Sequence, residues 1–269
     1  MSDGPRRIAA AFAVDRPLFI PYVMGGYPDV QMSLRHAEAL APHADILELG
    51  IPFSDPLADG PTIQAAGQTA LEAGTRPADV LDIAARVGTS GPPVVVMTYA
   101  NILLAAGPRA FLERAAAAGV AGLIIPDLPL DEAGEIREQA RRAGVALVPL
   151  VAPTTADERL AAVGRAGEGF VYCVSVTGVT GGQVQVDDAL SGFLARARAA
   201  IELPLVVGFG IRTAEQVMAI GEIADGAVIA SHLIRIADEA GGGAAGTRAI
   251  ESYAAGIADV LRSAPARSS

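Results

Sequence analysis

Acidic side chains gather in one short stretch of the chain, from Asp45 to Gly67 (DILELGIPFSDPLADGPTIQAAG). The stretch opens as an apolar strand pattern that a single carboxylate, Glu48, interrupts, and Asp55 and Asp59 follow in a proline-rich loop. In a barrel of parallel strands, catalytic groups lie at the carboxyl ends of the strands and in the loops that follow. A carboxyl group among aliphatic side chains acquires a raised pKa, which suits general acid–base catalysis. The stretch therefore predicts proton-transfer chemistry centred on Glu48.

Each of these acids also has a structural interpretation. Glu48 could pair with an arginine, although apolar strands rarely carry a lone carboxylate for packing alone. Asp59 precedes Gly60 and Pro61, where a helix could begin, so a turn or capping role fits the spacing as well as a catalytic one. Asp55 lies within Ser-Asp-Pro, which favours a simple turn.

A second group of candidate residues lies late in the chain, where three loops carry small residues after successive strands. They are TGVTGG at 177–182, GFGI at 208–211, and Ala230-Ser231, which opens a short helix. Barrels often hold phosphate with the loops after strands seven and eight and the amino end of a small extra helix. Main-chain N–H groups and the helix dipole attract an anion without any lysine. The pattern predicts a phosphate site, which Arg212 could assist unless it is solvated or salt-bridged.

Three other reactive side chains occur near the expected strand ends. Alternation along a strand places Tyr172 on one face with Phe170 and Val174, so its hydroxyl could exchange a proton near Glu48 or only pack. Cys173 lies on the opposite face and is interpreted as a small core residue. For His232, a surface or capping position is the simpler interpretation.

Composition excludes several kinds of protein. The chain has no lysine and three histidines, so a Schiff base through its own amine is excluded and a histidine metal site is disfavoured. A net charge of −10 argues against nucleic acid or an anionic membrane as partner. The single cysteine excludes an internal disulfide and fits a reducing compartment. Neither a signal peptide nor a run of about 20 apolar residues is visible. We therefore expect a soluble, cytoplasmic protein.

The order of the predicted elements indicates the fold class. Eight apolar strands alternate with helices, which is typical of parallel βα units. With 269 residues, the chain has the size of one α/β barrel. We expect a single (β/α)8 TIM barrel domain over residues 1–269 with extra short helices, and a frayed tail at 263–269. An open doubly wound sheet is disfavoured, because no phosphate fingerprint follows the first strand. The predicted strands are 18–23, 46–49, 94–98, 122–125, 146–150, 170–175, 205–207 and 227–230. After the last strand we expect a helix at 232–236, a glycine-rich loop at 241–246 and a helix at 248–262.

The segment LELGIPFSDPLADGPTIQ, together with SVTGVTG and GFGI, closely resembles the tryptophan synthase α subunit family. The resemblance extends from Pro21-Tyr22 to the final helices. It implies a lyase of tryptophan biosynthesis that cleaves indole-3-glycerol phosphate to indole and glyceraldehyde 3-phosphate by a retro-aldol reaction. It also implies an α2β2 heterotetramer in which pyridoxal phosphate belongs to the β subunit, with no cofactor in this chain.

The family's functional residues carry over onto matching positions of this sequence. The resemblance makes Glu48 the general acid–base, Asp59 the acceptor for the indole N–H, and Tyr172 the hydroxyl beside Glu48. The implied substrate-binding positions are Tyr22 and Tyr99 at the indole pocket, Thr180 in the closing loop, and Gly181, Phe209, Gly210, Ala230 and Ser231 around the phosphate. The implied partner-interface positions are Pro52, Asp55 and Asn101.

The chain departs from the usual family pattern at several positions. Tyr22 stands where phenylalanine is common, and Ala230 where the phosphate loop often has glycine. The loop after Thr180 lacks an arginine that some members carry. Three other functions compete with the main prediction: a free-standing lyase that releases indole, a binding subunit that only activates its partner, and a generic phosphate-binding barrel isomerase.

Overall fold

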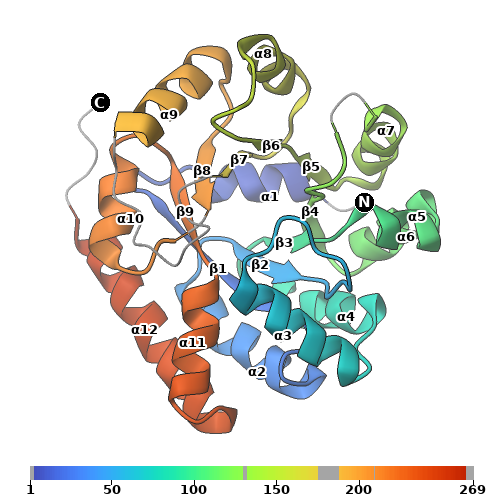
Figure 1. Cartoon of the computed structure of the whole chain (residues 1–269), viewed down its shortest axis with the longest axis vertical. Coiled ribbons are helices and arrows are strands. Elements are labelled where there is room, and N and C mark those ends of the chain that lie inside the picture. Colours follow the sequence, from blue (N-terminus) through green and yellow to red (C-terminus); the bar gives the residue numbers. More distant parts are fainter. Residues whose placement is uncertain (1–2, 130–131, 175–187, 209, 265–269) are drawn as a thin grey trace.

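Parallel strands form a ring at the centre of the protein in its computed structural model, which describes residues 3–129, 132–174, 188–208 and 210–264 (Figure 1). Every strand pairing is parallel, and the order around the sheet is β5-β4-β3-β2-β1-β9-β8-β7-β6. The strands are β1 (Leu18–Met24), β2 (Leu47–Gly50), β3 (Val94–Met97), β4 (Val120–Ile124), β5 (Ala146–Val148), β6 (Leu150–Val151), β7 (Val171–Val174), β8 (Leu205–Gly208) and β9 (Gly226–Ile229).

One predicted strand, 146–150, is divided in two by Pro149, which raises the count from the expected eight to nine. Proline lacks the N–H that a continuous ladder requires. The first half, β5, pairs with β4, and the second half, β6, pairs with β7. The carbonyl of Pro149 still accepts the N–H of Tyr172 at 2.9 Å, so the chain itself closes the ring. The expected TIM barrel is thus confirmed, with one interrupted strand.

The strands alternate between two packing layers, as their apolar composition predicts. Leu47 and Leu49 point outward into the core between strands and helices. Ile46 belongs instead to the core inside the barrel, which also holds Tyr22 and Tyr172. Because neighbouring residues of a strand face opposite sides, Glu48 must point inward. The sequence alone gives the same orientation, because alternation places Ile46 and Glu48 on one face of the strand and Leu47 and Leu49 on the face toward the helices.

Helices surround the ring and cover its outer face (Figure 1). They are α1 (Gly4–Ala11), α2 (Val30–Leu40), α3 (Pro61–Glu72), α4 (Pro77–Gly88), α5 (Ala100–Ala106), α6 (Pro108–Ala117), α7 (Gly134–Ala143), α8 (Asp157–Ala166), α9 (Asp188–Ala200), α10 (Ala214–Gly221), α11 (Ser231–Glu239) and α12 (Gly243–Ser263), with a 3-10 turn, η1 (Ala41–His43). The α1 helix closes the amino-terminal end of the barrel. Its Arg7 donates to the carbonyls of Gly88, at the end of α4, and Gly119, just before β4. Ile8 enters the inner core.

Two predicted segments differ from the structure. The α5 helix was not predicted, because it is only seven residues long and directly precedes the stronger start signal at Pro108. The glycine-rich loop expected at 241–246 is wrong, because α12 already begins at Gly243. Gly246 serves helix packing there, since an added Cβ would come within 2.7 Å of the Ala237 carbonyl oxygen on α11. Among the described residues, no helix is both long and apolar enough to cross a membrane.

Candidate active site

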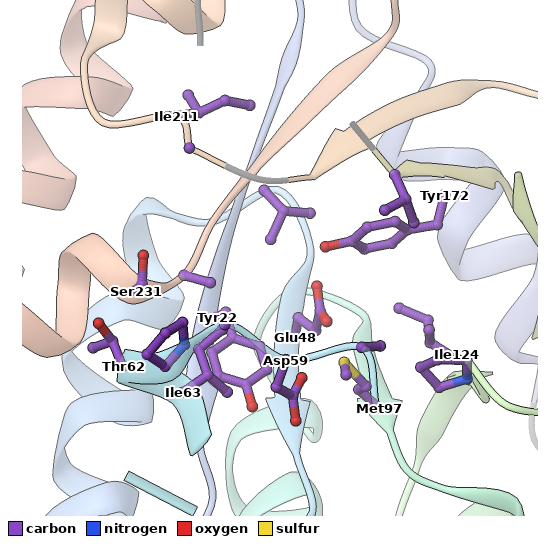
Figure 2. Close-up of a pocket in the computed structure, with 18 of the residues that line it drawn as sticks. Tyr22, Glu48, Asp59, Thr62, Ile63, Met97, Ile124, Tyr172, Ile211 and Ser231 are labelled. Carbon is purple, nitrogen blue, oxygen red and sulfur yellow. The ribbon is translucent and has the colours of Figure 1, made fainter. Parts of the chain in front are cut away.

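A cavity of about 290 Å³ opens at the carboxyl ends of the strands, opposite α1. Its walls include residues from β1, β2, β7 and β9, the loop before α3, and the first turns of α3 and α11. Figure 2 shows Glu48 between Tyr172 and Asp59, while Ser231 and Thr62 lie together at another side of the cavity. The lining residues are Tyr22, Glu48, Ala58, Asp59, Gly60, Pro61, Thr62, Ile63, Met97, Ile124, Pro126, Leu150, Tyr172, Val174, Gly210, Ile211, Arg212, Val228, Ala230, Ser231 and Arg235.

Glu48 is a buried acid with no structural partner that would account for it. Only 2% of the residue is exposed, and its Oε2 atom has no hydrogen-bond partner among the described residues. Burial, followed by the charge of Asp59, raises the pKa of Glu48 to about 8. In the part of the chain that the structure describes, Glu48 forms no ion pair, so the arginine-pairing interpretation is wrong. At neutral pH the carboxyl group is therefore mostly protonated and able to give a proton to a substrate.

Asp59 lies opposite Glu48 and does not cap a helix. The N-cap of α3 is Gly60, with Pro61 in the first turn. The Asp59 Oδ2 atom accepts from the Tyr99 hydroxyl at 3.2 Å, and that hydroxyl oxygen accepts the Ala58 N–H at 3.2 Å. Burial raises the pKa of Asp59, and the Tyr99 hydrogen bond acts in the opposite direction by stabilising the carboxylate. The loop thus presents to the cavity a carboxylate that Tyr99 holds in place.

Tyr99 stands behind Asp59, because it is buried and is not among the cavity-lining residues. Its ring stacks on Phe53 with 4.9 Å between the ring centroids, which fixes the hydroxyl under the loop. The structure therefore places Tyr99 as a support for Asp59, whereas the family resemblance suggests a position on the pocket wall.

Two other tyrosines, Tyr22 and Tyr172, enter the cavity by the same arrangement. Each ring crosses to the neighbouring strand and covers a glycine. The Tyr22 ring covers Gly50, where an added Cβ would come within 2.0 Å of the Tyr22 hydroxyl. The Tyr172 ring covers Gly208, where an added Cβ would come within 2.2 Å of the Tyr172 hydroxyl. Burial, together with the charges of Glu48 and Asp59, raises the pKa of both tyrosines well above the ordinary value. Both hydroxyls therefore remain protonated and can donate but not ionise. Tyr172 thus does more than pack in the core, because its ring forms part of the cavity wall.

Positive charge and the amino end of α11 define another side of the cavity. Ser231 is the first residue of α11, and Ala230 precedes it as the N-cap. Gly210, Arg212 and Arg235 also line this side. Unsatisfied N–H groups at a helix start attract anions, and guanidinium groups strengthen that attraction. An anionic group of a ligand would bind here.

The remaining predicted site residues lie outside the cavity or outside the described part of the chain. Thr180, Gly181 and Phe209 lie outside the described residues. Pro52 is buried, and Asp55 and Asn101 are exposed. The side chain of Asp55 accepts from Ser54, as expected for a turn. Cys173 faces the outer core, and burial raises the pKa of its thiol to about 12, in agreement with a packing role.

Arg235 and most of the apolar wall, formed by Ile63, Met97 and Ile124, were not predicted from the sequence. Arg235 follows Ser231 by four residues, so both lie on one face of α11. Because a helix opening at Ala230-Ser231 was predicted, this spacing was the signal in the sequence that could have identified Arg235. In the described part of the chain, no group of three or more His, Cys, Asp or Glu side chains could hold a metal ion.

Comparison with known proteins identifies the family. The family model described as tryptophan synthase alpha chain matches residues 8–260. The chain belongs to the tryptophan synthase alpha chain family. The tryptophan synthase alpha chain of Gluconacetobacter diazotrophicus is 48% identical over 237 residues, which cover 87% of this chain and 86% of that relative. The alpha chain of Methanocaldococcus jannaschii is 42% identical over 223 residues, covering 82% and 79% of the two chains.

Solved structures of tryptophan synthases have the same fold. A chain of Mycobacterium tuberculosis tryptophan synthase superimposes with a TM-score of 0.88 at 36% identity, covering 98% of this chain and 99% of that one. The tryptophan synthase alpha chain of Legionella pneumophila gives a TM-score of 0.86 at 29% identity, with 97% and 98% covered. The barrel of this chain is therefore the barrel of the alpha chain family over nearly its whole length.

Proposed function

We infer that this chain cleaves indole-3-glycerol phosphate to indole and glyceraldehyde 3-phosphate, with Glu48 as the acid–base residue. The observation that carries this proposal is the state of Glu48: buried on the cavity wall, opposite a second carboxylate, with its pKa raised to about 8. A protonated acid in that position can deliver a proton to an aromatic ring carbon, which is the step that an indole leaving group requires.

The proton balance of the reaction needs one group that acts twice. Glu48 first gives its proton to the indole carbon that bears the glycerol chain, and the ring becomes a cation. The resulting Glu48 carboxylate then takes the proton of the adjacent glycerol hydroxyl. The electron pair of that O–H bond forms the aldehyde, and the carbon–carbon bond breaks to return its electrons to the ring. The indole ring serves as the electron sink, so we propose that the chain needs no cofactor of its own.

Asp59 and Tyr172 complete the reactive part of the proposed site. The Asp59 carboxylate accepts the indole N–H and stabilises the ring cation, which develops only after protonation. Tyr99 keeps this carboxylate oriented through the 3.2 Å hydrogen bond. Tyr172 donates from the other side of Glu48, and its raised pKa keeps it a donor throughout the cycle. Tyr22 and the apolar wall surround the ring.

The phosphate of the substrate occupies the side of the cavity where α11 begins. Of the residues proposed to surround the phosphate, the structure describes Ser231, Ala230 and Gly210. Gly181 and Phe209 are proposed from the sequence alone. A ligand anchored there extends toward Glu48 through the shared cavity. Anchoring of the unreactive end positions the reacting carbon and raises its effective concentration at the acid.

We also propose that the chain works with a β subunit that carries pyridoxal phosphate. The proposal is supported by the family to which the chain belongs and by its likeness to the solved structure of M. tuberculosis tryptophan synthase. Two large apolar side chains, Leu57 at 87% and Leu104 at 58%, are exposed near the proposed interface residues Asp55 and Asn101. Exposed apolar side chains of this size suit a surface that a partner covers.

The deciding experiment measures indole release from indole-3-glycerol phosphate by the purified chain, alone and with the β subunit from the same source. We expect release without added cofactor, and a severalfold or larger increase with the β subunit. No indole under either condition would refute the proposed reaction. Release that no β subunit changes, without a complex in sedimentation, would instead indicate a free-standing lyase.

A further inference from the structure

Arg235 is an arginine of the cavity wall that forms no ion pair with any described residue. Its side chain lines the cavity on the same face of α11 as Ser231, one turn further along the helix. The nearest polar contact is weak, from Nη1 to the Thr62 Oγ1 atom at 3.5 Å. Within the described residues, no carboxylate forms an ion pair with it.

The surroundings of Arg235 are positively charged. Arg212 lines the same side of the cavity, and its main chain is held by hydrogen bonds to the Tyr253 hydroxyl and the Gln216 side chain. The pKa of Arg235 is lowered, first by burial and then by the charge of Arg212, although Glu239 opposes the shift. The pKa of His232 is lowered by burial and by both arginines. Two guanidinium groups that repel each other are stabilised together by an anion between them.

The main chain alone offers a modest anion site at this position. The N–H groups at the start of α11 carry only the partial charge of a helix terminus. Ala230, at the N-cap, adds a methyl group where the family often has glycine, and this methyl lies at the cavity wall. An arginine one turn along the helix supplies a full charge and several N–H donors, and it reaches the same space from the side.

We propose that the side chain of Arg235 binds the substrate phosphate and supplies most of the positive charge that the start of α11 lacks. This inference rests on the proposed function, because it assigns a residue to the phosphate side of the same cavity. Arg235 acts in binding and does not touch the reacting atoms. Its loss should therefore weaken the binding of the substrate and of the transition state equally, which raises KM and leaves kcat unchanged.

The test compares Arg235→Gln and Arg235→Lys with the parent chain and with Arg248→Gln, a matched control at an exposed arginine on α12. Calorimetry measures the Kd of inorganic phosphate and of glycerol 3-phosphate, and steady-state assays give KM and kcat. For Arg235→Gln we expect about tenfold weaker phosphate binding and an equal rise in KM, as for a lost hydrogen bond to a charged group. Arg235→Lys should restore most of the affinity, and Arg248→Gln should match the parent.

Two further observations separate charge from structure. The difference between the parent and Arg235→Gln should shrink in high salt, because partly exposed charges are screened. Thermal melting should change little, since the contact with Thr62 that the variant loses is weak, at 3.5 Å. An unchanged phosphate Kd in Arg235→Gln would overturn the proposal, as would equal losses in the Gln and Lys variants with a lower Tm. Phosphate binding is measured without turnover, so a chain that binds phosphate through Arg235 but releases no indole would refute only the reaction.

Discussion

The cavity has a reactive side around Glu48 and a phosphate side at the start of α11, and different structural elements form the two sides. The reactive side consists of side chains on strands and on the loop before α3, and its acids and phenols all have raised pKa values because they are buried. The phosphate side consists of a helix start, short loops and arginines, and there the pKa values of Arg235 and His232 are lowered. Burial disfavours the charged form on both sides: it leaves Glu48 mostly protonated at neutral pH, whereas the arginines remain charged. Reactivity and anchoring can therefore be altered separately.

The largest expected effect comes from Glu48→Gln, which removes the proton that the reactive side donates. We expect kcat to fall by about 10²–10⁴-fold, the usual contribution of a general acid–base residue. The affinity for inorganic phosphate should stay the same, since the other side of the cavity is untouched. The measurements are single-turnover indole release and phosphate calorimetry. If cleavage by the variant equals that of the parent, Glu48 is not the catalyst, and the chain could then serve only to activate a partner.

Asp59→Asn should have the next largest effect, because it neutralises the proposed acceptor for the indole N–H. A hydrogen bond to a charged group is worth about 1.5–3 kcal/mol, so a loss of roughly 10–100-fold in kcat/KM is expected. Tyr99→Phe, which removes only the 3.2 Å support of Asp59, should lose less. Steady-state kinetics on the two variants give the order. A larger loss in Tyr99→Phe than in Asp59→Asn would contradict the supporting role of Tyr99.

The pH dependence should report the buried acid. Cleavage requires protonated Glu48, so kcat/KM should decline as the pH rises through about 8. Stability should follow the same group: between the ordinary glutamate pKa of 4.5 and about 8, the folded state keeps the proton, whereas the unfolded chain releases it. Over that interval the parent loses stability relative to Glu48→Gln as the pH rises. Parallel denaturation curves at pH 5 and 9 for the two proteins measure the difference, and a constant gap would show that Glu48 is not protonated in the fold.

Tyr22→Phe should have the smallest effect on the reactive side. Among the described residues, the hydroxyl of Tyr22 has one hydrogen-bond partner, the Met24 sulfur at 3.8 Å, which is a weak acceptor. Its loss should change the free energy of unfolding by no more than about 1 kcal/mol. Chemical denaturation and steady-state kinetics measure the two effects. A decrease in kcat close to that of Asp59→Asn would show that Tyr22 donates to the reacting groups.

Sequence reasoning predicted the reactive side better than the phosphate side. Alternation along a short strand was sufficient to turn Glu48 inward, because Leu47 and Leu49 must meet the helices. No local rule decided between capping and catalysis for Asp59, since that depends on Tyr99, which is 40 residues away in the chain. The family resemblance supplied this role, and the geometry supports it.

The phosphate side was harder to predict because Arg235 lies one helical turn beyond the small residues that mark the site. A short helix opening at Ala230-Ser231 was predicted, and α11 does begin at Ser231, but the four-residue spacing from Ser231 to Arg235 was not used. A second error concerns α12, where Gly246 allows close packing against α11 but was interpreted as part of a loop. The sequence shows where a glycine is, but it does not show which neighbouring helix leaves no room for a larger side chain there.

The packing of Tyr22 over Gly50 and of Tyr172 over Gly208 restricts which substitutions this site can accept. In both cases the glycine is the strand partner of the residue two positions after the tyrosine, as Met24 pairs with Gly50 and Val174 pairs with Gly208. Any side chain at either glycine would displace a ring that lines the cavity. The position of each ring therefore depends on the absence of a side chain at its glycine. A substitution that enlarges the glycine must move the ring, whereas one that shortens the tyrosine changes the pocket shape and loses stability by leaving a cavity.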